Sequence, residues 1–127
     1  MDNERFSFEK LEVYAESRKL VKEVYQLVKQ LPPEEKFALS SQIRRAAASI
    51  TANIAEGSGR FSIKEKTYFI GIAFGSLMEV FSELQTALDL GFITEASLEA
   101  LRPQFIVVAK MLSGLRRHFS TALQPSH

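Results

Sequence analysis

Apolar side chains recur at steps of three, four or seven positions through most of the chain, which is the spacing of one helix face. In the first segment this stripe consists of Val13, Leu20, Val24, Val28 and Leu31, widened by Tyr14, Val21 and Tyr25. In the last segment it consists of Leu98, Leu101, Phe105, Val108, Leu112, Leu115 and Phe119. No window of comparable length alternates at period two, so the pattern predicts helices throughout.

Proline and glycine mark where the first two helices end. The first is expected from about Ser7 to Leu31, because Pro32-Pro33 cannot continue a helix. The second follows directly, with Glu34 and Glu35 in its first turn, where the helix dipole favours anions. It is expected to end at Gly57-Ser58-Gly59 with a glycine in the left-handed conformation.

Capping residues mark where the last two helices begin. Ser62 with Glu65 forms a capping box for a third helix that ends at Gly91. Thr94 caps a fourth helix that extends to about Leu123, with a kink or restart at Pro103.

Short connections between long helices favour antiparallel neighbours, so the fold class is all-α: an up-down-up-down four-helix bundle. A chain of 127 residues is the length of one domain. We assign residues 7–123 to the bundle, residues 1–6 to a flexible N-terminus and residues 124–127 to a disordered tail.

A polar row runs beside the apolar stripe of the second helix and faces polar positions of the third. Its members are Gln42, Arg45, Ser49, Asn53 and Glu56 on the second helix, with Ser76 and Glu79 on the third. In a hairpin that turns near residue 60, Arg45 lies opposite the turn from Ser76 to Glu79, so we predict an Arg45–Glu79 ion pair joined by Gln42. This network either fixes the register of the hairpin or lines a functional pocket; charges near a core are tolerated when paired, which favours a structural role.

The composition of the chain excludes several kinds of chemical site. The chain has no cysteine, which excludes disulfides, thiolate metal sites and cysteine nucleophiles. Its two histidines lack the spacing of a metal site in a bundle, and Gly57-Ser58-Gly59-Arg60 lacks the lysine and hydroxyl of a phosphate-binding loop. We therefore expect no enzyme activity, no cofactor and no metal. The start of the chain lacks a signal peptide and no apolar run is long enough for a membrane span, so a cytoplasmic protein is expected.

The third helix is apolar over more than half its circumference if Phe74, Met78 and Phe81 are added to its core stripe. A helix in a monomeric bundle buries a narrower face, and the exposed remainder would form a large apolar patch. We therefore predict that these three residues form an oligomer interface; the alternative is that the ten phenylalanines fill one large core.

The middle of the chain resembles a known family. The residues that carry the resemblance are Leu31-Pro32-Pro33-Glu34-Glu35, Leu39, Gln42, Arg45-Ala46, Ser49-Ile50, Asn53-Ile54-Ala55-Glu56-Gly57, Ala73, Gly75-Ser76 and Glu79. They look like the signature of the bacterial four-helix bundle proteins, also called ribosomal-RNA intervening-sequence proteins. The resemblance covers about Phe8 to Gly91, and it extends to the last helix by pattern only.

The resemblance implies a homopentameric ring whose biochemical role is largely undefined. The accessory variability proteins of diversity-generating retroelements are similar in fold; they work beside a reverse transcriptase and bind nucleic acid. A homopentamer, RNA or DNA, and a nucleic-acid-processing protein are thus the partners that the resemblance suggests.

Basic residues gather near the end of the chain, although the net charge is only +1. No acidic residue follows Glu99, whereas Arg102, Lys110, Arg116 and Arg117 do. Repeated in each subunit of a ring, this surface would bind phosphates without reading sequence. The two hypotheses are therefore a self-assembling scaffold that binds RNA or DNA through these residues, and a scaffold for protein interactions alone. On the first helix Arg18, Lys22 and Lys29 form a second basic flank, for which we expect solvation or pairing with another subunit.

Overall fold

The computed structural model describes residues 4–122, which form four α-helices, two 3-10 turns and no strand. The α-helices are α1 (Glu12–Val28), α2 (Leu39–Ser58), α3 (Ile63–Asp89) and α4 (Glu95–Ala122). The 3-10 turns are η1 (Ser7–Lys10), before α1, and η2 (Pro33–Glu35), before α2.

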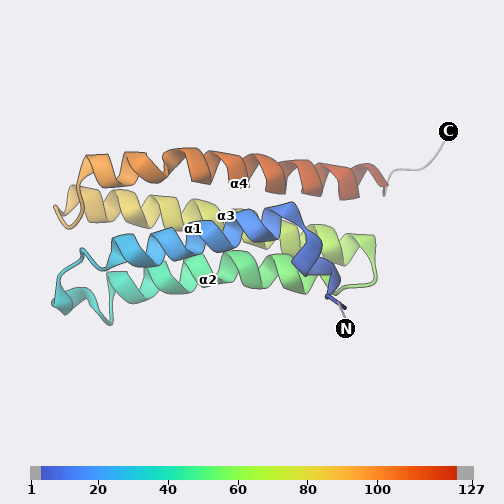
Figure 1. Ribbon diagram of the computed structural model, residues 1–127, viewed down its shortest axis with the longest axis horizontal. Coiled ribbons are helices and arrows are strands. Elements are labelled where there is room, and N and C mark those ends of the chain that lie inside the picture. The colour runs from blue at the N-terminus through green and yellow to red at the C-terminus, as the bar shows by residue number, and fades with distance from the viewer. Residues whose placement is uncertain (1–3, 123–127) are drawn as a thin grey trace.

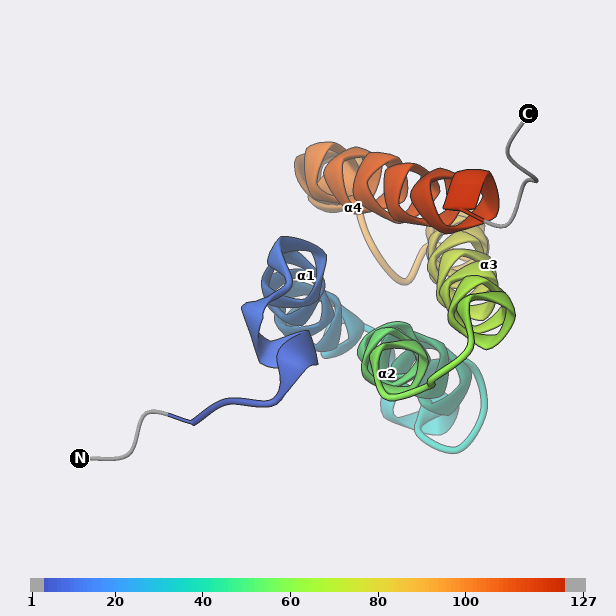
Figure 2. The ribbon, with the colours of Figure 1, turned by 90° about the vertical axis from the view of Figure 1, so that its right-hand side faces the viewer.

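The helices run alternately up and down and lie side by side (Figure 1). Each packs against the next in sequence and α4 also lies beside α1, while no diagonal pair of helices brings Cα atoms within 8 Å of each other (Figure 2). The most extensive contact is between α2 and α3, and the least extensive of these four is between α1 and α4. The predicted all-α, up-down-up-down bundle is confirmed.

The core is built from the predicted stripes. All five stripe residues of the first segment are buried, and so are Leu98, Leu101, Phe105, Val108 and Leu112 of α4. Leu115 and Phe119 are only half-buried, because the C-terminal half of α4 leaves α1 and lies over α3 (Figure 2). The three residues that widen the first stripe are not core residues: Tyr14 and Val21 are half-buried and Tyr25 is exposed.

The first two helices begin later than predicted. Leu11 has an extended backbone (φ −75°, ψ 127°), which separates η1 from α1. Glu34 and Glu35 belong to η2 rather than to the first turn of α2. The carboxylate of Glu35 still serves the helix start, since it accepts a hydrogen bond of 3.3 Å from the backbone N–H of Leu39.

Glycine acts differently from the prediction at the end of α2. Gly59 has φ −82°, a right-handed conformation, and the only glycine with positive φ in the described chain is Gly91, at φ 79°. Gly57 matters for packing instead. A Cβ atom there would lie 3.0 Å from Cβ of Phe69 and 3.4 Å from the carbonyl oxygen of Lys66, so glycine allows α2 and α3 to approach closely.

The predicted caps of α3 and α4 are confirmed. The Ser62 hydroxyl accepts a hydrogen bond of 3.0 Å from the N–H of Glu65, and the Thr94 hydroxyl accepts one of 3.1 Å from the N–H of Ser97. α4 continues through Pro103 without a restart.

The N-terminal turn is attached to the bundle. The Ser7 and Ser58 hydroxyls are 2.9 Å apart in a hydrogen bond, and the N–H of Phe6 donates to the Glu9 carboxylate at 2.7 Å. Residues 1–3 and the predicted tail 124–127 lie outside the described residues. Within residues 4–122, no helix combines the length and the apolar character that a membrane crossing requires.

Candidate functional site

Three members of the predicted polar row meet between α2 and α3. The hydroxyls of Ser49 and Ser76 share a hydrogen bond of 2.9 Å across the helix pair. The side-chain amide of Asn53 donates to the Ser49 hydroxyl and to the Ser49 carbonyl oxygen, each at 2.8 Å. These bonds satisfy polar groups at the edge of the core and join α2 to α3.

The other members of the row do not join this network. Arg45 and Gln42 are exposed, and Arg45 forms no ion pair with Glu79 within 4.0 Å, so the predicted Arg45–Glu79 pair is wrong. Because Ser49 lies opposite Ser76 in this antiparallel pair, Arg45, one turn before Ser49 on α2, lies opposite Val80 on α3. Arg45 is exposed there, so water competes with carboxylates for its guanidinium. Glu56 instead pairs with Arg60 at 3.2 Å.

Glu83, which is not a member of the predicted polar row, lies next to Glu79 in this region. One of its carboxylate oxygens is buried without a hydrogen-bond partner. Burial raises the pKa of Glu83, the neighbouring Glu79 raises it further, and the positive charge of Arg45 opposes both effects.

Two of the three predicted interface residues, Met78 and Phe81, line an apolar groove between α3 and α4. This α3–α4 groove has a volume of about 320 Å³ and includes Met78, Phe81, Phe105, Ile106 and Ala109 in its lining. The Phe81 ring packs edge-on against Phe105, with centroids 5.0 Å apart. Met78, Ile106 and the adjacent Val107 are 43%, 45% and 42% exposed, so a part of this apolar surface remains uncovered.

Arg102 belongs to the same groove. Its guanidinium lies over the Phe81 ring, 4.9 Å from the centroid, and forms two hydrogen bonds with the Glu99 carboxylate. The hydrogen bonds with Arg102 lower the pKa of Glu99 and those with Glu99 raise the pKa of Arg102. The positive charge of Arg102 is thus offset by a neighbour.

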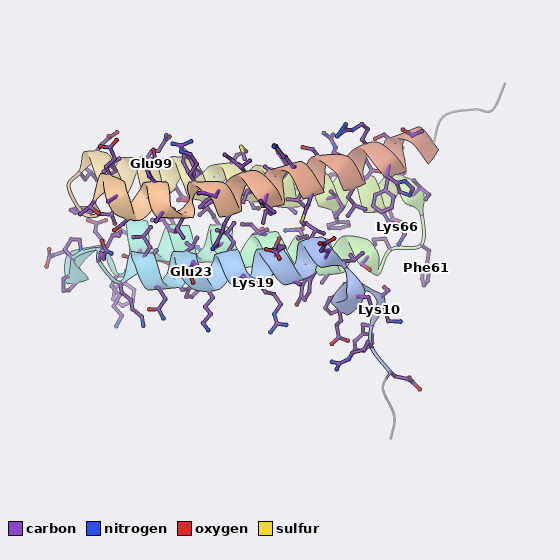
Figure 3. The ribbon with its side chains drawn as sticks, turned by 45° about the horizontal axis from the view of Figure 1, so that its top comes forward. Lys10, Lys19, Glu23, Phe61, Lys66 and Glu99 are labelled. Carbon is purple, nitrogen blue, oxygen red and sulfur yellow. The ribbon has the colours of Figure 1, made fainter. Side chains whose placement is uncertain are left out.

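The predicted basic surface is divided along α4. Glu99 and the Arg102 that it binds lie at the end of the bundle opposite Phe61 (Figure 3). Arg116 and Arg117 lie about 20 Å away along the helix and line a second hollow of about 310 Å³ with Phe74. The Arg116 side chain passes across Gly71, since a Cβ at Gly71 would lie 3.6 Å from Nε of Arg116. Lys110 is exposed between the two ends.

Predicted interface residues and predicted phosphate-binding residues therefore alternate on one face. Phe81 contacts Arg102, and Phe74 shares a hollow with Arg116 and Arg117. The two sets lie on separate helices, α3 and α4, and only the packing of these helices interleaves them.

A further groove, between α1 and α2, was not predicted. This α1–α2 groove has a volume of about 520 Å³, and its lining includes Tyr14, Arg18, Lys22, Tyr25, Lys29 and Thr51. The sequence identified the three cations as a flank of the first helix, but treated the tyrosines as part of the core stripe.

In the described part of the chain, no group of three or more His, Asp or Glu side chains is arranged to hold a metal ion. His118 is exposed, and its ring contacts that of Phe119.

Comparison with known proteins assigns the chain to a family. The model of the 23S rRNA-intervening sequence protein family matches residues 9–114. A crystal structure from Bacteroides thetaiotaomicron VPI-5482, described as a protein with unknown function from the S23 ribosomal protein family, is similar with a TM-score of 0.75. The two chains are 26% identical over 83% of this chain and 95% of that one. No match was found among curated proteins. The family match covers most of the chain and agrees with the fold, so the chain belongs to the 23S rRNA-intervening sequence protein family.

Proposed function

We propose that this protein is a non-enzymatic helical module that self-associates through the α3–α4 groove and holds nucleic acid on the assembled particle. The observation that carries the self-association is the uncovered apolar lining of this groove, in which Met78 and Ile106 are both more than two-fifths exposed. The assembly that we propose is the homopentameric ring that the family resemblance implies.

An apolar strip of this kind favours contact with another protein surface. Met78 and Ile106 come from different helices, and Phe81 and Phe105 form a packed aromatic base between them. Aromatic residues, methionine and arginine are the types enriched at the centre of protein interfaces. Arg102, held by Glu99, supplies a positioned guanidinium at the same place.

The nucleic-acid part of the proposal depends on the free cations of α4. Lys110, Arg116 and Arg117 form no ion pair within 4.0 Å among the described residues, unlike Arg102. Copies of these side chains on each subunit would add to a positive field, although one chain has a net charge of only +1. Binding would be independent of sequence, since phosphates carry no base information. Such a particle would present RNA or DNA to a nucleic-acid-processing protein.

The dependence of binding on salt concentration tests the proposal that the protein holds nucleic acid. Binding to a mixed pool of single- and double-stranded RNA and DNA is measured at about 50 and 200 mM salt, where six or more phosphate contacts lower the affinity by about a thousandfold or more. We expect the triple variant Lys110→Glu, Arg116→Glu, Arg117→Glu to bind at least tenfold more weakly at the lower salt.

Lys64→Glu is the matched control, because Lys64 is an exposed lysine in the first turn of α3. We expect it to bind as the wild type does. If the wild type binds nothing at the lower salt, the nucleic-acid part is wrong and a scaffold for protein interactions is the remaining function.

A further inference from the structure

The α1–α2 groove gathers cations and aromatic rings on one side of α1. Tyr14, Arg18, Lys22, Tyr25 and Lys29 fall within about 80° around the helix and extend over about 22 Å along it. They form a stripe in which tyrosines and cations are interspersed.

Carboxylates are kept away from this stripe. The glutamates of α1 are Glu12, Glu16 and Glu23, which lie on the opposite side of the helix by the same geometry. Lys19 lies at the edge of the glutamate side, about 60° around the helix from Lys22, and pairs with Glu16 at 3.3 Å. α1 therefore has one face with mixed charge and one face with only positive charge.

The α2 wall of the groove adds no carboxylate either. Thr51 lines the groove, and Arg44, Ala48 and Ala55 share its face of α2. The Tyr25 hydroxyl donates to the backbone carbonyl oxygen of Arg44 at 3.4 Å, so the Tyr25 ring is held against this wall. The small side chains of α2 leave the groove open beside the ring.

The cations of the groove are not neutralised within the chain. Arg18, Lys22 and Lys29 form no ion pair within 4.0 Å among the described residues. The guanidinium of Arg18 lies over the Tyr14 ring, 6.0 Å from its centroid. Like charges along one groove repel one another, and a ligand with closely spaced negative charges removes this repulsion.

The stripe continues onto the N-terminal turn. A neighbouring hollow of about 550 Å³ shares Tyr14 and Arg18 with the groove and adds Phe6, Phe8 and Lys10 from η1 and its start. Phe8 packs edge-on against Tyr14, with centroids 4.9 Å apart, and Phe6 stacks on Phe8. Glu9 also lines this hollow and pairs with Arg5 at 3.8 Å.

We infer that the α1–α2 groove is a binding site for single-stranded nucleic acid. Arg18, Lys22 and Lys29 contact successive phosphates, and unpaired bases stack on the exposed ring of Tyr25 and on Tyr14. A duplex hides its base faces within the stack, whereas a single strand offers them to aromatic side chains. A polyanion without bases or other aromatic groups would use the cations but would not stack on the rings. This inference rests on the nucleic-acid part of the proposed function and gives it a second site, distinct from α4.

The test uses fluorescence anisotropy with a labelled single-stranded RNA of about 20 nucleotides, a duplex of equal length and heparin, a polyanion without bases. In the variant Lys22→Gln, Lys29→Gln, the slope of log affinity against log salt should decrease by about 0.7 for each lysine. Lys19→Gln, the same change on α1 but outside the lining of the groove, should leave the slope and the affinity unaltered.

Variants of Tyr25 distinguish the contribution of base stacking to binding from the contribution of charge. Tyr25→Leu should weaken binding of the single strand by about tenfold with an unchanged salt slope, and should leave heparin binding within about twofold. Tyr25→Phe, which keeps the ring, should bind the single strand within about threefold of the wild type.

The outcomes separate this inference from the proposed function. If the groove variants bind the single strand as the wild type does while the α4 triple variant does not, the groove is not the site and the α4 surface stands. If the groove variants lose binding and the α4 variant keeps it, the inference holds and the α4 assignment fails. If the groove variants differ from the wild type in molar mass, the groove is an interface between copies and the inference is wrong.

Discussion

At the residue scale, Glu83 combines burial with repulsion. One of its oxygens is buried without a partner, and Glu79 is its acidic neighbour. Both effects disfavour the ionised form, so the pKa of Glu83 is higher in the folded protein than in the unfolded chain. The folded state then binds this proton more readily, and the stability that the protonated form contributes is lost as the pH rises from the ordinary value of 4.5 through the raised pKa.

We therefore predict that Glu83→Gln flattens the dependence of stability on pH. The variant cannot ionise at this position, so its free energy of unfolding at neutral pH should equal or exceed that of the wild type. The gain should be less than about 1 kcal/mol, because solvent screens the charges in this region. Urea unfolding at several pH values from 4 to 7 measures this. Glu23→Gln, at an exposed position of α1, is the control and should follow the wild type. The same pH slope in Glu83→Gln and the wild type would contradict the assignment.

At the element scale, the apolar stripe and the cap of α4 were predicted well. Five of the seven stripe residues are buried, and the hydroxyl of Thr94 caps the helix as expected. These features depend on neighbours within one turn of helix, which a sequence displays directly.

Features that depend on packing were missed. No proline or glycine marks the extended Leu11, so the break between η1 and α1 had no local signal. The Arg45–Glu79 pair was predicted from an antiparallel arrangement that is correct. However, an exposed ion pair contributes little to the free energy of folding, so nothing requires these two side chains to meet. Arg102 over Phe81, and Arg116 across Gly71, depend on how α4 crosses α3, which periodicity does not specify.

Gly57 gives an element-scale prediction, because it sets how closely α2 and α3 approach. Gly57→Ala places a methyl group against Phe69 and the Lys66 carbonyl, so it should destabilise the protein by about 1–3 kcal/mol. Gly59→Ala is the matched control. A Cβ there would be at least 3.6 Å from its neighbours and the backbone is right-handed, so the change should be neutral or stabilising by up to about 1 kcal/mol. Urea unfolding compares the two; equal stabilities would show that the hairpin does not need glycine at position 57.

At the scale of the whole molecule, two surfaces remain uncovered on different sides of the bundle. The α3–α4 groove is apolar with arginines beside it, and the α1–α2 groove is basic with tyrosines beside it. If the first is buried between copies, the free cations of α1 remain exposed on each subunit, and a ring would repeat them. The face through which the copies associate therefore decides which cations remain available to bind nucleic acid.

Multi-angle light scattering on the intact chain, over a wide range of concentrations, tests self-association through the α3–α4 groove. We expect a molar mass several times the 14.3 kDa of one chain, and five times for the ring. Met78→Glu with Ile106→Glu should shift the mass toward that of one chain, since charge would be buried in the groove. Leu90→Glu, at an exposed apolar position in the turn between α3 and α4, should leave the mass unchanged. If the wild-type protein has the mass of a single chain at every concentration, the chains do not self-associate and the proposed assembly is wrong.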